Sequence, residues 1–119
     1  MDNLRNGIKL RRKEVAMVVR VLIKRRIKEG KAREVFALLN QFRSQAMDQA
    51  GYVSGETLIN YDDPREILVT GFWHSVQNWL DWKTSKERIT NEKWLERYLD
   101  GPTEYKKYVL GTMQTKRHD

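Results

Sequence analysis

The stretch that most constrains the fold is VAMVVRVLI, residues 15–23. As an extended strand it places apolar side chains on both faces, with Arg20 as the exception. One face carries Val15, Met17, Val19, Val21 and Ile23, and the other carries Ala16, Val18 and Leu22. A strand that is apolar on both faces has to be covered on both. The sequence therefore predicts a sheet that is packed on its two sides.

The rest of the chain supplies two helices and three further strands. Apolar residues at spacings of three and four predict an amphipathic helix over residues 31–49, which ends before Gly51. Residues 52–61 and 66–74 read as two strands, and the DDPR between them is turn chemistry, so they form a hairpin.

Two serines organise the second helical region. Ser75 is a good N-cap for a helix that starts at Val76, and Ser85 restarts a second segment after an interruption at Lys83 and Thr84. That segment carries Ile89, Leu95, Tyr98 and Leu99, and it stops at Gly101 and Pro102. Residues 103–111 are the last strand.

The order β-α-β-β-α-β predicts an α+β, ferredoxin-like domain with a four-stranded antiparallel sheet and both helices on one face. The other face is left bare, and the strands predict it to be largely apolar. A large exposed apolar surface usually marks an interface, so a homodimer that packs sheet against sheet is expected. Within the 119 residues, 14–112 form this domain, 1–13 a basic leader and 113–119 a tail.

Charge is unevenly distributed. Residues 1–33 carry twelve Lys or Arg and three acids, although the whole chain has a net charge of only +7. One cluster lies in the leader and a second, at Lys24, Arg25, Arg26 and Lys28, follows the first strand. Such clusters suit a nucleic acid or an anionic surface, but a solvated tail and a charged loop are the simpler explanation. With no long apolar run, the chain is expected to be cytoplasmic, without a membrane span.

Several kinds of chemistry lack the residues they need. The chain has no cysteine and two histidines, and it has no Gly-rich phosphate loop and no HExxH motif. Neither a metal site nor a bound cofactor is therefore expected. The acids Asp62, Asp63 and Glu66 cluster at the hairpin, where a solvated turn is a simpler interpretation than a divalent cation site.

Three of the four tryptophans, Trp73, Trp79 and Trp82, fall within ten residues. Trp79 lies on the inward stripe of its helix and is predicted to be core. Trp73 and Trp82 either pack in the core or wall a cavity, since an indole offers a broad flat surface to an aromatic ligand.

Three further residues are candidates for the same cavity. Arg88 is a surface helix residue or an anion contact, and Phe36 on the first helix is a candidate substrate contact. His74 is a lone titratable group just past a strand and the one weak candidate for a catalytic base.

The segments IKEGKAREVFALL, GYVSGETLINYDD and PREILVTGFWHSVQNWLDWKTSKER resemble the antibiotic biosynthesis monooxygenase family. In that family a Lys-x-Gly turn opens the first helix, a Gly-aromatic pair opens the second strand, and the third strand ends in Trp before a Ser-capped helix. The resemblance extends over residues 15–110. It implies a dimeric α/β barrel and oxygenation of electron-rich aromatic substrates, often without metal or flavin.

The sequence departs from relatives of known chemistry at several positions. Related haem-degrading enzymes use a Trp, an iron-ligating His and an Asn on the first strand. Trp82 matches the first, but the His position falls near Glu92 and residues 15–23 contain no Asn. Many members place His where this chain has Trp82 and Arg88.

Three functions therefore remain open. The resemblance favours a cofactor-independent monooxygenase that acts on a phenol or quinol. The missing histidines keep open a non-catalytic ligand-binding or regulatory dimer of the same fold. A nucleic-acid-binding module is disfavoured, because EILVTGFWH lacks the basic residue and aromatic pattern of an RNA-binding strand.

Overall fold

The computed structural model describes residues 18–111 and contains four strands and three helices in that part of the chain. Their order is β1 (Val19–Arg26), α2 (Ala32–Ala46), β2 (Tyr52–Ile59), β3 (Glu66–Trp73), α3 (Val76–Lys83), α4 (Lys86–Glu96) and β4 (Glu104–Val109). The strands form one antiparallel sheet in the order β2-β3-β1-β4. The ferredoxin-like α+β prediction is thereby confirmed, with the second helix divided into α3 and α4.

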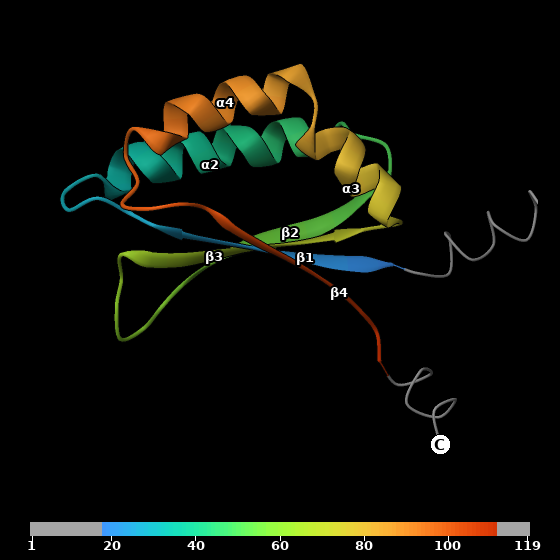
Figure 1. Ribbon diagram of the computed structural model, residues 1–119, viewed down its shortest axis with the longest axis horizontal. Helices are drawn as coiled ribbons and strands as arrows, with labels where there is room; N and C mark the ends of the chain where they lie inside the picture. Colours follow the sequence, from blue (N-terminus) through green and yellow to red (C-terminus); the bar gives the residue numbers. More distant parts are fainter. Residues whose placement is uncertain (1–17, 112–119) are drawn as a thin grey trace, which may run out of the picture.

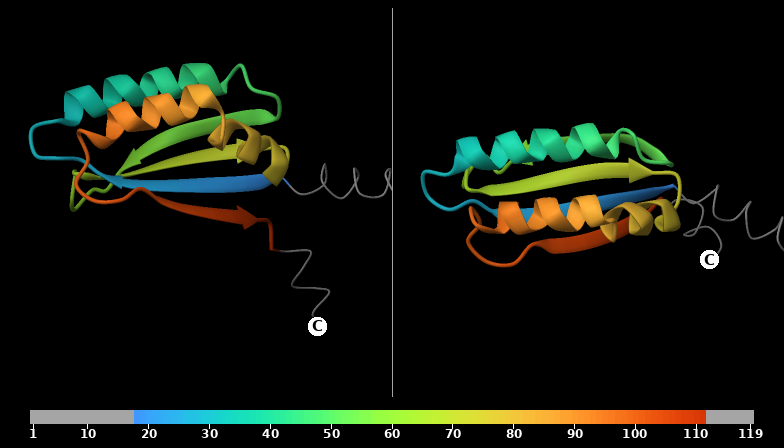
Figure 2. Two further views of the ribbon diagram at one scale, coloured as in Figure 1. Left: turned by 45° about the horizontal axis from the view of Figure 1, so that its top comes forward. Right: turned by 90° about the horizontal axis from the view of Figure 1, so that it is seen from above.

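The helices all lie on one face of the sheet (Figure 1). Seen from above, α2 runs over the side of β2 and β3, whereas α4 runs over the side of β1 and β4 (Figure 2). Serine residues cap both α3 and α4 as the sequence predicts, and the cap at Ser85 separates the two helices. The Ser75 hydroxyl accepts the Asn78 backbone N–H at 3.1 Å, and the Ser85 hydroxyl accepts that of Arg88 at 3.2 Å.

Strand β1 corrects the prediction of a strand apolar on both faces. It starts at Val19 and runs through Arg26, three residues beyond the predicted end, because β3 and β4 pair with it along this length. Its odd-numbered residues face the helices and are buried. Its even-numbered residues face away, and three of these four are basic: Arg20, Lys24 and Arg26. The predicted residues 15–17, like the leader and the tail, lie outside the described residues.

The core between sheet and helices consists of two adjoining clusters. The first contains the tryptophans and is formed by Val19, Val21, Ile23, Ala46, Trp73, Trp79 and Trp82. The second lies toward the start of α2 and the end of α4 and is formed by Ile27, Val35, Leu39, Phe42, Ile67, Leu95 and Leu99. In β1, Arg25 stands between the last strand residue of the first cluster, Ile23, and the first residue of the second, Ile27.

The face of the sheet opposite the helices is uncovered by any described residue (Figure 1). The strand register places both apolar and charged side chains on this face, which was predicted to be largely apolar. Its apolar members are Leu22, Leu58, Leu68, Phe72 and Tyr108. Charged side chains lie among them, and the Arg20 guanidinium stacks over Phe72 with 4.3 Å between the guanidinium carbon and the ring centroid. Among residues 18–111, no helix is long and apolar enough to cross a membrane.

Candidate functional site

A cavity of about 70 Å³ lies between the helices and the sheet. Two glycines that pair across neighbouring strands, Gly55 in β2 and Gly71 in β3, line it. Both occupy register positions that face the helices, where the other strands carry bulky side chains. Because these two positions have no side chain, neighbouring aromatic side chains approach the backbone closely. A Cβ added at Gly71 would lie 3.3 Å from the Trp73 indole nitrogen, and one at Gly55 would lie 2.7 Å from the Tyr52 hydroxyl oxygen.

Aromatic side chains form one wall of the cavity. Trp73 from β3 and Trp79 and Trp82 from α3 all line it, and each is at most 4% exposed. The Trp73 and Trp79 rings are 5.9 Å apart between centroids, and Tyr52 meets Trp73 edge-on at 5.2 Å. The sequence left core packing and a cavity wall as alternatives for Trp73 and Trp82. Both descriptions hold, because these rings pack in the first core cluster and line the cavity.

Two buried arginines form a second wall. Arg25 of β1 and Arg88 of α4 both line the cavity, and their side chains are 1% and 3% exposed. They share one carboxylate oxygen, Glu92 Oε1, at 2.5 Å from Arg25 Nη2 and 3.0 Å from Arg88 Nη2. Arg88 Nη1 also donates to the Tyr105 hydroxyl at 3.3 Å. We call Arg25, Glu92 and Arg88 the charge triad.

The environment of the triad is aromatic. The Arg88 guanidinium carbon is 5.2 Å from the Trp79 ring centroid and 6.0 Å from that of Phe42, and Arg25 approaches the same Phe42 ring at 5.8 Å. Burial lowers the pKa of Arg25 from its ordinary value, and the neighbouring positive charge of Arg88 lowers it further, whereas Glu92 opposes both effects. The two cations are therefore held close together in a poorly solvated place with a single counterion.

Placement of the predicted site residues is uneven. Trp73, Trp82 and Arg88 lie together around the cavity. Phe36 is half-buried against the second core cluster and is not among the lining residues, and His74 is exposed and also lies off the cavity.

Arg25 and Glu92 were not among the site residues predicted from the sequence. The first strand was predicted to end at Ile23, which left Arg25 in a charged loop. Continued alternation of Val19, Val21 and Ile23 places Arg25 on the buried face. Glu92 is four residues after Arg88 and therefore lies on the same side of α4.

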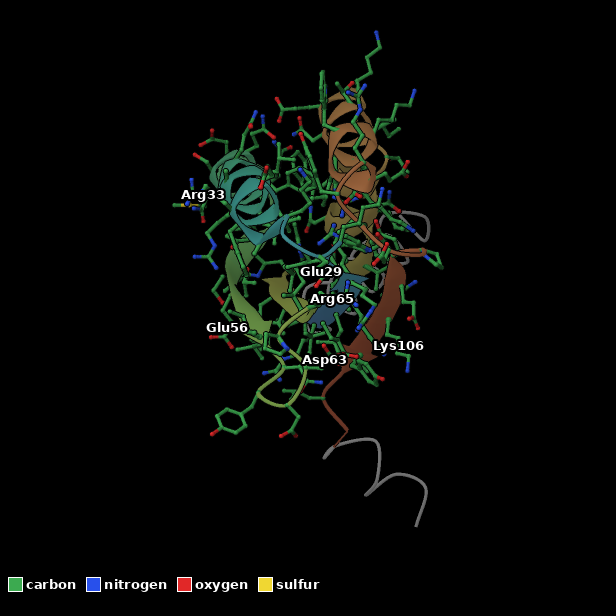
Figure 3. The ribbon with its side chains drawn as sticks, turned by 90° about the vertical axis from the view of Figure 1, so that its left-hand side faces the viewer. Glu29, Arg33, Glu56, Asp63, Arg65 and Lys106 are labelled. Carbon is green, nitrogen blue, oxygen red and sulfur yellow. The ribbon has the colours of Figure 1, made fainter. Side chains whose placement is uncertain are left out.

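The exposed residues in the lining, Arg43 on α2 and Glu56 on β2, mark the mouth of the cavity, although the strand register places Glu56 on the uncovered face of the sheet. Figure 3 shows Glu56 on β2 at one edge of the sheet and Lys106 on β4 at the other. Tyr52 is half-buried here, and this burial raises the pKa of its hydroxyl, which stays protonated. An apolar cavity of roughly 150 Å³ holds benzene. The cavity of about 70 Å³ is smaller than that, so an aromatic ring would fit only by extending into the mouth.

The acidic hairpin is a network of ion pairs. Asp63 contacts Arg26 at 2.6 Å, and Glu66 contacts Lys24 at 3.7 Å. Arg26 holds the pKa of the Asp63 carboxyl below its usual range, chiefly through their hydrogen bond. Among the residues that the structure describes, no group of three or more His, Cys, Asp or Glu side chains is arranged to hold a metal ion.

The second basic cluster is not a solvated loop. Lys24, Arg25 and Arg26 lie within β1, and each is paired with an acid: Glu66, Glu92 and Asp63 respectively. Lys28 follows the strand, and its ammonium donates to the Arg97 carbonyl oxygen at 3.0 Å. Because most of these charges already have partners within the domain, the cluster offers little free charge to a phosphate backbone.

Together, a ferredoxin-like sheet covered by helices on one face and an aromatic-walled cavity beneath them define a small α+β domain with an internal cavity. Residues 18–90 match the sequence profile of the family described as antibiotic biosynthesis monooxygenase. This match covers more than half of the chain, and the protein belongs to that family.

Similar proteins agree with this assignment. Protein SchA from Streptomyces halstedii is 26% identical over 92 residues, which are 77% of this chain but 24% of SchA. The chain thus spans about a quarter of that relative. Among solved structures, SnoaB from Streptomyces nogalater, a cofactor-independent oxygenase, has a TM-score of 0.71 at 12% identity and covers 79% of this chain and 93% of its own. A conserved protein from Methanosarcina mazei has a TM-score of 0.73 at 18% identity, with coverages of 77% and 91%. These structural likenesses concern the fold.

Proposed function

We propose that the protein is a cofactor-independent monooxygenase that oxidises a small phenol or quinol in the cavity between α2 and the sheet. The observation that carries the proposal is the pairing of a tryptophan wall with two buried arginines around one cavity. A flat indole surface suits an aromatic ring, and guanidinium groups stabilise the phenolate that such a ring has to form. Membership of the family and the fold shared with SnoaB support the same chemistry.

The reaction needs no reductant other than the substrate. A phenolate delivers an electron to dioxygen, the resulting radical pair forms a carbon–oxygen bond at a ring carbon that bears hydrogen, and the hydroperoxide loses water. One C–H bond and the O–O bond break, and a carbonyl and water form. A phenol thus becomes a quinone: one oxygen atom enters the product, the other leaves as water, and the substrate loses the electrons that reduce it.

Each wall of the cavity has a role in this scheme. Trp73 and Trp82 hold the ring, which fixes its position relative to dioxygen and excludes water. Arg88 and Arg25 favour the phenolate over the phenol. No histidine is among the lining residues in the described part of the chain. The substrate therefore has to be acidic enough to release its phenolic proton to solvent and to bind as the phenolate. His74, the residue considered as a base, is exposed and off the cavity.

The proposal includes a homodimer formed through the uncovered face of the sheet. That face presents Leu22, Leu68 and Phe72 at its centre, and basic residues of β1 and acidic residues of β2 and β3 lie on the same face. A two-fold axis brings unlike charges of the two copies within reach while the apolar centre is buried. The family resemblance implies the same association.

A non-catalytic ligand-binding dimer is the second candidate function. The observation in its favour is that the described lining residues contain no imidazole. Such a protein would bind the same aromatic compounds in the same cavity, and oxygen would not be consumed.

Oxygen uptake separates the two candidates. With a panel of hydroquinones and naphthols, the oxygenase takes up oxygen above the protein-free rate, and chelators leave that rate unchanged. Trp82→Ala removes a cavity wall and lowers the rate. Trp94→Ala is the matched control, because Trp94 is 50% exposed on α4 and is not among the lining residues. Uptake equal to the protein-free background with every compound rejects the oxygenase and leaves the binding dimer.

A further inference from the structure

The charges buried around the cavity do not balance. Arg25 and Arg88 bring two positive charges, and Glu92 brings one negative charge that both arginines share through the same oxygen atom. Glu92 is not itself among the lining residues, and the one acidic residue in the described lining, Glu56, is exposed and lies at a register position on the uncovered face of the sheet. Arg43, also exposed at the mouth, adds a further positive charge. The cavity is therefore electropositive.

Arg25 also has an unmet hydrogen bond. Among the buried side-chain nitrogen and oxygen atoms of residues 18–111, its Nε is the one that lacks a hydrogen-bond partner. The same side chain is 1% exposed, so water does not easily supply the missing acceptor. A buried donor without an acceptor costs about 1–3 kcal/mol, and native structures rarely retain one without a reason.

We propose that the cavity selects aromatic ligands that carry an anionic oxygen, as a carboxylate or a phenolate, and that Arg25 sets this preference. An anion beside Arg25 and Arg88 balances the triad and supplies an oxygen acceptor for the guanidinium groups. The ring of such a ligand lies against the tryptophan wall. This inference uses the cavity of the proposed function, but it concerns binding alone and does not require turnover.

Aromatic neighbours make the preference strong. Phe42 and Trp79 contact the two guanidinium groups and keep bulk water away from them. In a poorly solvated place the attraction between opposite charges is stronger than at the surface. A neutral ligand of the same shape leaves the excess charge and the Arg25 donor as they were, so it gains less on binding.

The test measures binding without oxygen. The purified protein is titrated anaerobically with benzoate and with 4-nitrophenol at a pH where the phenol is ionised, and quenching of tryptophan fluorescence reports occupancy. Benzamide and 4-nitrotoluene are the neutral isosteres of the two anions. We expect each anion to bind at least about tenfold more tightly than its isostere. The two arms show whether a carboxylate, a phenolate or both satisfy the site.

Two adjacent residues provide matched variants. Arg25→Met removes the excess charge and leaves Arg88 paired with Glu92. Lys24→Met removes the same charge from the next residue of β1, which points to the opposite face of the sheet. We expect Arg25→Met to abolish the tenfold preference, so that each anion and its neutral counterpart bind with similar affinity. Lys24→Met should retain the preference.

The outcomes are decisive in either direction. Equal binding of anions and isosteres by the wild-type protein overturns the proposal, as does the absence of binding by any anion at millimolar concentration. A preference that survives in a folded Arg25→Met protein removes the role of Arg25. If that variant fails to fold, the wild-type comparison still decides whether the cavity selects anions. Because no oxygen is present, a protein that binds anions but never turns over leaves this inference standing while the oxygenase proposal fails.

Discussion

Removing the shared carboxylate of the triad should destabilise the domain strongly. Glu92→Gln preserves the size of the side chain but leaves Arg25 and Arg88 as two buried positive charges without a counterion. Breaking a buried ion pair by removal of one partner costs about 3–5 kcal/mol. The Glu92 side chain is 13% exposed and retains some access to water, so we take the lower end, about 3 kcal/mol.

That loss is large for a small domain. Total stability is typically about 5–15 kcal/mol, and each kcal/mol shifts the melting temperature of such a domain by about 4–8 °C. We therefore expect Glu92→Gln to melt at least about 12 °C below the wild type. Urea unfolding followed by tryptophan fluorescence gives the free energy directly, since the buried rings of Trp73, Trp79 and Trp82 lie in the same core.

The control is Glu96→Gln, the same chemical change one turn later on α4 at an exposed position. It should change stability by less than about 0.5 kcal/mol. Arg25→Met is the informative comparison, because it leaves a balanced Arg88–Glu92 pair and should cost less than Glu92→Gln. A Glu92→Gln loss below about 1 kcal/mol, or a larger loss for Arg25→Met, would refute the view of the triad as two cations dependent on one carboxylate.

Three further results are expected. Gly55→Ala should destabilise by about 1–3 kcal/mol in urea unfolding, because its Cβ would lie 2.9 Å from the Thr70 carbonyl oxygen and 2.7 Å from the Tyr52 hydroxyl, and the backbone of the neighbouring strand cannot easily move away. An unchanged stability would contradict the close approach. Asp63→Asn should be less stable than wild type near neutral pH, because Arg26 lowers the folded-state pKa of Asp63 and so stabilises the folded protein while the carboxyl is ionised. The difference in stability should close as pH falls below about 4, where protonation removes this contribution. A difference that does not change with pH would contradict the pairing. In sedimentation at micromolar concentration the wild type should be a dimer and Leu68→Asp a folded monomer, whereas a monomeric wild type would reject the sheet-to-sheet dimer.

Most of the fold was predictable because local chemistry and the global arrangement agree. The serine caps, the DDPR turn and the Gly51 stop each specify one boundary, and together they fix the element order. The first strand was the exception. Its predicted start rests on apolar residues that lie outside the described part of the chain. Its predicted end falls before Lys24, since a run of basic residues ordinarily indicates a loop. Pairing with β3 and β4 overrides that local preference and carries the strand through Arg26.

The site was only partly predictable for a related reason. The tryptophans stand out in the sequence because three of the four fall within ten residues. Arg88 was left as either a surface helix residue or an anion contact, and its burial beside the cavity rules out the surface position. The cavity is lined by Gly55 and Gly71, whose pairing depends on register across two strands. No pattern within one segment shows that these glycines are opposite each other. Similarly, the contact between Arg25 and Glu92 joins residues 67 positions apart.

The charge triad is an inefficient way to stabilise the folded state. Apolar side chains of similar volume at three buried ionic positions are often neutral or more stable, and they require no matching of charges. A triad with one cation in excess is worse still, because the repulsion between Arg25 and Arg88 acts against the folded state. The tryptophan wall alone would close the core at this end of the sheet. The arrangement gains a physical reason only if something anionic enters the cavity, and a phenolate substrate is such a species. The free energy of folding that the charge repulsion costs would then be regained when an ionised ligand binds. The ionised form of a phenol is also the form that can reduce dioxygen.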